Sequence, residues 1–79
     1  MSSVIARIHY EAETSELFIW FVPTGLCYVY LDVPEAIYEE LAAAGSRGSF
    51  FNQHIRDHFE ARQVEPSETL ARHRRSLRS

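Results

Sequence analysis

The chain has 79 residues, enough for one domain, and 46% of them are hydrophobic, which is too many for a disordered chain. No apolar run approaches the roughly 20 residues of a membrane-spanning helix, and the first residues lack the basic and apolar regions of a secretory signal. The chain also has a single cysteine, Cys27, and so no internal disulfide. These features predict a cytoplasmic protein with no membrane attachment.

Charge divides the chain into two parts. Residues 1–65 carry four arginines against ten carboxylates, a net charge of −6, whereas residues 66–79 carry four arginines against one carboxylate, a net charge of +3. Because only Leu70 and Leu77 would give the residues after Arg62 an apolar face, we predict a single domain over residues 1–62 and a flexible arginine-rich tail over residues 63–79.

Three segments in the first half of the chain are predicted to be β-strands. Val4–Tyr10 alternates in period two, and Leu17–Val22 is a continuous apolar run of β-forming residues. Leu26–Leu31 follows after a turn in which Pro23 presets φ and Gly25 accepts a positive φ. Because the connections are short, the three strands are predicted to form an antiparallel meander.

Two helices are predicted to follow the strands. Pro34 suits the first position of a helix, and Gly45 suits the left-handed residue that ends it. Ser46 or Ser49 is expected to cap a second helix, whose buried stripe is predicted to be Phe51, Ile55 and Phe59. The predicted fold is α+β, a three-stranded antiparallel meander followed by two helices packed on one face.

Tyr28 and Tyr30 project from one face of the third predicted strand. They share that face with apolar residues of the other strands, namely Ile8, Leu17, Ile19 and Phe21. An aromatic pair on a sheet surface can stack on the bases of RNA, whereas the same pair beneath the helices belongs to the core. We favour the core, because the helical stripes need a sheet face on which to pack.

The opposite sheet face is also predicted to be apolar. It contains Ile5, Phe18, Trp20, Val22, Cys27, Val29 and Leu31, with only Arg7 and His9 as polar members. An uncovered face of this composition is a candidate protein interface, for which we select Phe18, Trp20, Val29 and Leu31. The alternatives are that the tail folds over this face or that the predicted register is locally incorrect.

An ordered set of motifs resembles the KTSC domain, named after the C-terminal domain of some lysyl-tRNA synthetases and also found alone in small bacterial and phage proteins. The set comprises Tyr10, Leu17, Ile19, Phe21, Gly25, Tyr28, Tyr30, Val33, Pro34, Tyr38, Leu41, Ser46, Gly48, Phe51, Asn52, Ile55 and Arg56. The chain departs from the family pattern at His9 and Phe59. The resemblance covers about residues 4 to 59 and implies a β-β-β-α-α fold without catalytic activity; RNA binding has been suggested for the family.

Other candidate chemistry is sparse. His54 and His58 have the spacing of two helical metal ligands, but a zinc site needs about four, so we favour two solvent-facing histidines. The set Ser46, Gly48 and Asn52 forms either a ligand-binding corner at a helix N-terminus or ordinary turn and cap chemistry, and we favour the second.

The residue pattern therefore predicts a non-catalytic module that binds no metal or cofactor. Its predicted partner is a second copy or another protein, bound at the apolar sheet face. The alternative is RNA, for which the candidate contacts are Arg56, Arg72, Arg74, Arg75 and Arg78, together with surface aromatics.

Overall fold

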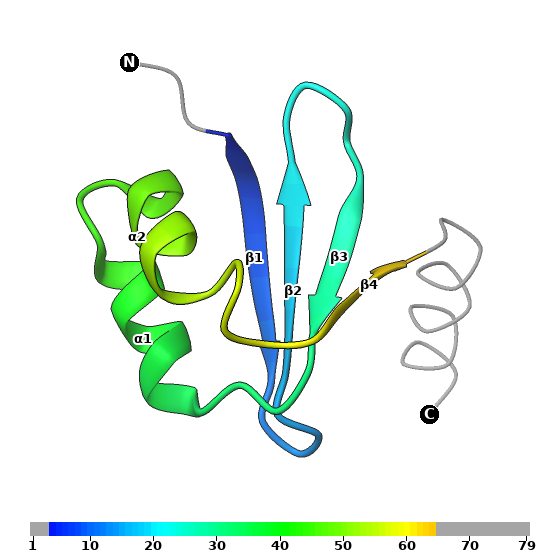
Figure 1. Ribbon diagram of the computed structural model, residues 1–79, viewed down its shortest axis with the longest axis vertical. Coiled ribbons are helices and arrows are strands. Elements are labelled where there is room, and N and C mark those ends of the chain that lie inside the picture. The colour runs from blue at the N-terminus through cyan, green and yellow to red at the C-terminus, as the bar shows by residue number, and fades with distance from the viewer. Residues whose placement is uncertain (1–3, 65–79) are drawn as a thin grey trace, which may run out of the picture.

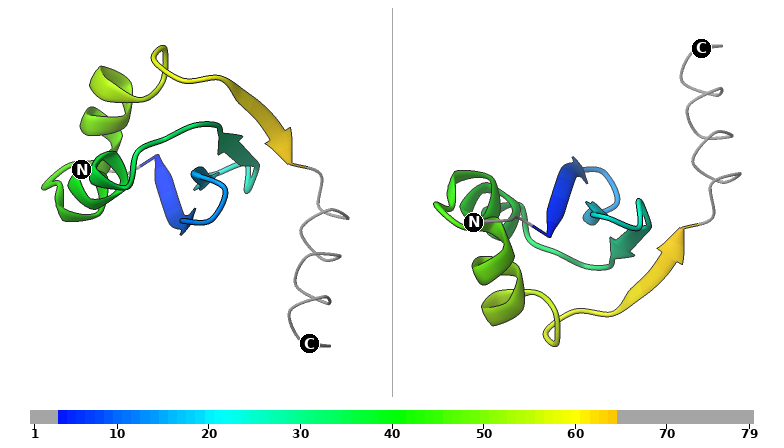
Figure 2. Two further views of the ribbon diagram at one scale, coloured as in Figure 1. Left: turned by 90° about the horizontal axis from the view of Figure 1, so that it is seen from below. Right: turned by 90° about the horizontal axis from the view of Figure 1, so that it is seen from above.

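The computed structural model describes residues 4–64 as a four-stranded antiparallel sheet with two helices (Figure 1). The elements in chain order are β1 (Ile5–Glu11), β2 (Glu16–Phe21), β3 (Cys27–Tyr30), α1 (Glu35–Ala43), α2 (Arg47–His54) and β4 (Ala61–Val64). The strand order is β1-β2-β3-β4, so each strand pairs with its neighbour in sequence. Both helices and the α2–β4 connection lie on one side of the sheet, which we call the inner face (Figure 2).

The fourth strand corrects the predicted three-stranded sheet. β4 pairs antiparallel with β3, with Ala61 opposite Tyr30 and Val64 opposite Cys27. It also crosses the predicted domain boundary after Arg62, since Gln63 and Val64 belong to the sheet. The rest of the predicted tail, residues 65–79, lies outside the described residues.

A β-bulge changes the predicted orientation at the start of β1. Ile5 pairs with Phe21, whereas Arg7 pairs with Trp20, so the register shifts by one residue between Ile5 and Arg7. A one-residue shift moves a side chain to the other face of a sheet. Ile5, predicted on the outer face, is therefore buried in the inner core.

Both helices begin close to the predicted positions, and α1 also ends close to its predicted end, whereas α2 ends earlier than predicted. Pro34 is the N-cap of α1 and not its predicted first residue, so the helix begins one residue later than predicted, at Glu35. Gly45 does not adopt the predicted left-handed conformation, because the only glycine with positive φ in residues 4–64 is Gly25, at 75°. The residue that caps the C-terminus of α1 is Ala44, with φ −66°. Ser46 caps α2 as predicted, since its hydroxyl oxygen accepts a 3.3 Å hydrogen bond from the Ser49 amide.

The main core lies between the inner face and the helices. Its buried members are Ile5, Leu17, Ile19, Tyr30, Val33, Leu41, Phe51 and Ile55. Phe59 packs against this core from beyond the end of α2, because the helix stops at His54 instead of continuing along the predicted stripe. The strand alternation thus directs one half of the apolar residues to the helices and leaves the other half on the opposite, outer face.

Candidate binding surfaces of the sheet

The two tyrosines of β3 occupy the inner face, as predicted, but differ in exposure. Tyr30 is 6% exposed and contacts Phe51 edge to face, with ring centroids 5.5 Å apart. Tyr28 is half-buried and makes an edge-to-face contact of 5.9 Å with Phe21. Tyr30 is therefore a core residue, whereas part of Tyr28 remains accessible.

The pKa of the Tyr30 hydroxyl on β3 is influenced by a charged residue just after α2. Burial raises the pKa of the Tyr30 hydroxyl, the neighbouring Tyr28 adds to the rise, and the Arg56 guanidinium opposes it. Arg56 itself is exposed and lies just after α2. Of the predicted RNA contacts, Arg56 is near enough to Tyr30 to lower the pKa of its hydroxyl, while the arginines at 72, 74, 75 and 78 lie outside the described residues.

Tyr10 and Tyr38 join the sheet to the first helix. The Tyr10 hydroxyl donates a 2.6 Å hydrogen bond to the Val33 carbonyl oxygen, and its ring stacks on Tyr38 at 5.2 Å with an interplanar angle of 12°. The contact fixes the segment that leads from β3 into α1. Spacing alone did not predict this pair; both residues belong to the family motif.

The Ser46, Gly48 and Asn52 set has the geometry of a helix start. Ser46 is the N-cap of α2, and a Cβ built on Gly48 would lie 3.4 Å from the Val4 side chain. Asn52 is exposed one turn further along the helix. The cap accounts for Ser46, which agrees with ordinary turn and cap chemistry.

The outer face holds a second hydrophobic cluster. Phe18, Cys27, Val29 and Val64 are buried, and Trp20 and Leu31 are half-buried against them. Phe18 is 6% exposed and Val29 is 0% exposed, so the centre of the candidate interface is shielded while Trp20 and Leu31 at its margins are partly accessible. Val64, the last described residue, is a member of this cluster that the sequence did not predict.

Two basic side chains on β1 contact the aromatic rings of the outer cluster. The Arg7 guanidinium carbon lies 4.9 Å from the centroid of the Trp20 ring, a cation–π distance. The His9 ring lies 5.9 Å from the ring of Phe18. Arg7 and His9, the only two polar residues predicted on this face, therefore both contact its aromatic rings.

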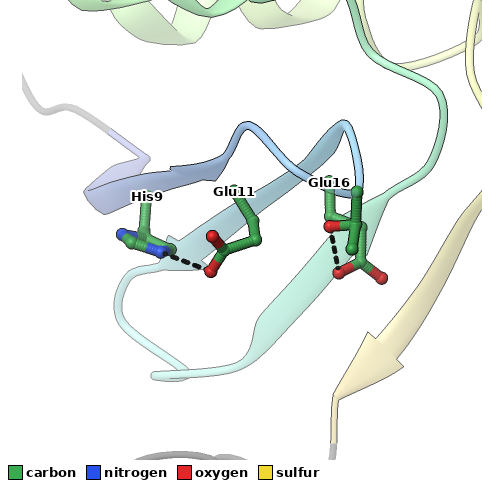
Figure 3. A network of polar contacts seen from close by, with 4 residues as sticks. His9, Glu11 and Glu16 are labelled. Atoms are coloured by element: carbon green, nitrogen blue, oxygen red, sulfur yellow. Dashed lines mark hydrogen bonds and ion pairs between the residues drawn. The ribbon is translucent and has the colours of Figure 1, made fainter. Parts of the chain in front are cut away.

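An acidic row borders the outer cluster at the β1–β2 hairpin. Glu11 and Glu16 are direct cross-strand partners, and Glu16 accepts a 2.8 Å hydrogen bond from the Thr14 hydroxyl (Figure 3). His9 lies 3.7 Å from Glu11 on the same face (Figure 3). Beyond the ends of β3 and β4, the Leu31 amide donates a 2.8 Å hydrogen bond to the Glu60 carbonyl oxygen.

The remaining candidates provide no reactive constellation within residues 4–64. His54 packs on the Phe50 ring at 4.6 Å, whereas His58 contacts the Gln53 carbonyl oxygen at 3.1 Å, so the two histidines have separate partners. Burial raises the pKa of the Cys27 thiol, although the nearby Arg7 acts to lower it. The raised pKa keeps the sulfur protonated. Among these described residues, no group of three His, Cys, Asp or Glu side chains is arranged to hold a metal ion.

No helix in the described part of the chain is long and apolar enough to cross a membrane. Two regions of the described surface are candidate binding regions. One is the outer cluster with its acidic border, and the other is the inner-face margin around Tyr28 and Arg56.

Comparison with known proteins agrees with the architecture. The family model of the KTSC domain matches residues 1–59. A crystal structure of a KTSC domain protein from Yersinia pestis superposes with a TM-score of 0.75 at 35% identity, covering 82% of this chain and 92% of that one. The sequence is also 39% identical over 62 residues to a lysine–tRNA ligase of Nostoc punctiforme, covering 78% of this chain but only 11% of the ligase. The chain therefore belongs to the KTSC domain family.

Proposed function

We propose that this KTSC domain is a non-catalytic binding module whose binding surface is the outer sheet face. The observation that carries the proposal is the second hydrophobic cluster, which lies on the face opposite the two described helices. A two-layer α+β domain ordinarily presents polar side chains on its outer sheet face. Trp20 and Leu31 keep part of their apolar surface accessible at the margin of this cluster, which favours a role in association.

The partner in this proposal is a second copy of the chain or another protein. Trp20 and Leu31 are half-buried and stand at the margins of the cluster, where an incoming surface reaches them first. Large aromatic side chains are the residues that most often dominate the binding energy of protein interfaces. Trp20 is therefore the side chain whose replacement tests the proposal most directly.

We expect Trp20→Arg to weaken association at this face. In sedimentation equilibrium, the wild-type chain should gain average mass as its concentration rises to the high micromolar range, and the variant should gain less. The matched control is Leu26→Arg, which adds the same charge at a side chain 39% exposed in the β2–β3 turn. A wild-type chain that remains monomeric throughout and retains no partner from its host would contradict the proposal.

Binding of single-stranded RNA is the second candidate function. It is favoured by the accessible part of Tyr28, by the exposed Arg56, whose charge lowers the pKa of Tyr30, and by the four arginines of residues 66–79. Aromatic rings beside cationic side chains are the elements that single-strand binders use. A relative of this chain is a lysine–tRNA ligase, although the matched region is a small part of that enzyme.

If RNA is bound through the four distal arginines, affinity should fall steeply with salt. Four phosphate contacts at roughly 0.7 each predict a log–log slope near −3 in a fluorescence anisotropy titration. Replacing Arg72, Arg74, Arg75 and Arg78 with glutamine should abolish binding, whereas four lysines in their place should preserve most of it by keeping the charge. Binding that does not respond to salt or to the glutamine variant would exclude these arginines from the contact.

A further inference from the structure

Part of the accessible outer face lies along β1. Arg7 and His9 are exposed, the Glu11 side chain is 46% exposed, and Trp20 on the neighbouring strand is half-buried. The centre of the outer cluster, in contrast, is almost fully buried. We call Arg7, His9, Glu11 and Trp20 the β1 flank. A partner that approaches from this side meets the β1 flank before the centre of the cluster.

Contacts within the molecule hold these side chains on the outer face. The Arg7 guanidinium lies over the Trp20 ring, and the His9 ring packs on Phe18. His9 lies 3.7 Å from a carboxylate oxygen of Glu11, and both side chains project away from the described helices (Figure 3). Because successive residues of a strand alternate between faces, residues 7, 9 and 11 form one line that carries a cation, an imidazole and an anion.

This line of charges is complementary to itself. A two-fold axis through His9 that reverses the strand direction places Arg7 of each copy beside Glu11 of the other. At about 3.4 Å per residue, Arg7 and Glu11 lie roughly 14 Å apart along the strand, so the two ion pairs form on either side of the axis. If the two strands ran in the same direction, each residue would face its own copy and like charges would meet. Charge complementarity therefore favours a second copy of the chain, in one orientation.

We propose that two copies of the chain associate through their β1 flanks about a two-fold axis at His9, with each Arg7 beside Glu11 of the partner subunit. This inference rests on the proposed function, because it identifies the partner at the outer face as a second copy. Trp20 lies beneath Arg7 and adds its accessible apolar surface at both ends of the contact. Stable interfaces have roughly 20–30 residues on each side, so a contact centred on four side chains gives a weak dimer that forms at high concentration.

The test is a mixture of two charge-reversal variants, Arg7→Glu and Glu11→Arg. Each variant alone should dimerise about tenfold or more weakly than the wild type, because like charges meet at both ends of the contact. An equimolar mixture should recover most of the wild-type affinity. In the mixed dimer the two substituted residues pair with each other at one end, and the native Glu11 and Arg7 pair at the other. Sedimentation equilibrium at equal total concentration measures the change, after far-UV circular dichroism has shown that each variant is folded.

The matched controls are Arg56→Glu and Glu39→Arg, which make the same changes of charge at exposed positions just after α2 and in α1. Both positions lie outside the β1 flank. Each control should associate like the wild type, and mixing the two should change nothing. The controls therefore separate a local pairing of charges from an effect of net charge.

Trp20→Arg in the same experiment separates this inference from the proposed function. If both are correct, this variant and each charge reversal weaken association, and only the mixture of Arg7→Glu with Glu11→Arg restores it. Association that depends on Trp20 but is not restored in the mixture overturns the two-fold contact alone. Restoration in the mixture without an effect of Trp20→Arg supports the contact and removes the apolar cluster from the binding surface. A wild-type chain that stays monomeric at high micromolar concentration overturns the inference, even where another protein binds at Trp20.

Discussion

Replacing Tyr30 with alanine is expected to lower the free energy of unfolding by about 3 kcal/mol or more, as for other large buried aromatic residues. The ring is 6% exposed and contacts Phe51 edge to face, so its removal leaves a cavity between β3 and α2. The cost is large for a chain of this size, because small domains have total stabilities of about 5–15 kcal/mol. Urea denaturation followed by far-UV circular dichroism measures the change directly.

The Tyr30→Phe variant separates the ring from its hydroxyl. It keeps the buried ring and should retain most of the stability lost in Tyr30→Ala. It should also change the alkaline response, because burial raises the pKa of the Tyr30 hydroxyl above its ordinary value of 10.0. A raised pKa means that the folded state holds the proton longer, so this stabilising contribution is present below pH 10 and is lost as pH rises through the folded pKa.

The wild type should therefore lose more stability than Tyr30→Phe between pH 9 and pH 12.

Tyr28→Ala serves as a second comparison. Because the Tyr28 ring is half-buried, its removal should lower the free energy of unfolding less than removal of the Tyr30 ring. Almost no loss of unfolding free energy in Tyr30→Ala would show that the Tyr30 ring is exposed and not part of the core. That result would favour the base-stacking role of the inner face.

The sequence predicted the two faces of the sheet well, because successive side chains of a strand point to opposite faces whatever their polarity. Leu17, Ile19 and Tyr30 lie in the inner cluster, and Phe18, Trp20 and Val29 lie in the outer one, as the period of two required. The pattern failed at Ile5, where a bulge inserts one residue into β1. A bulge leaves no compositional trace in a stretch such as Val4–Arg7, so only the pairing partners reveal it.

β4 was missed for a different reason. Three of its four residues are exposed, and Val64 alone is buried, so the segment lacks the apolar alternation that identifies a half-buried strand. Its stability comes from pairing with β3, a contact between residues more than 30 positions apart. Gly45 was misassigned because glycine is only the commonest helix terminator, and the chain here leaves α1 through the extended conformation of Ala44.

The candidate surface was predictable in composition but not in arrangement. Its four proposed contacts, Phe18, Trp20, Val29 and Leu31, lie in one cluster. The acidic border depends on which residues pair across the strands, in particular Glu11 with Glu16. Charge counts along the chain therefore identified an acidic body but could not place its carboxylates beside the apolar face.

Leu41→Ala is expected to cost about 2–5 kcal/mol of unfolding free energy. Leu41 is 0% exposed and is the only buried residue of α1, so it carries the packing of that helix on the inner core. Alanine is the best intrinsic helix former, so the loss reflects packing and not backbone preference. The urea midpoint should fall while the slope of the transition stays similar.

The matched control for this variant is Glu40→Ala, at the exposed position immediately before Leu41 in the same helix. Its midpoint should stay close to that of the wild type, because it removes no core contact. A Leu41→Ala midpoint equal to that of Glu40→Ala would mean that α1 does not depend on this side chain for its attachment. The sheet, with Tyr10 holding the Val33 carbonyl and stacking on Tyr38, would then suffice to hold α1 in place.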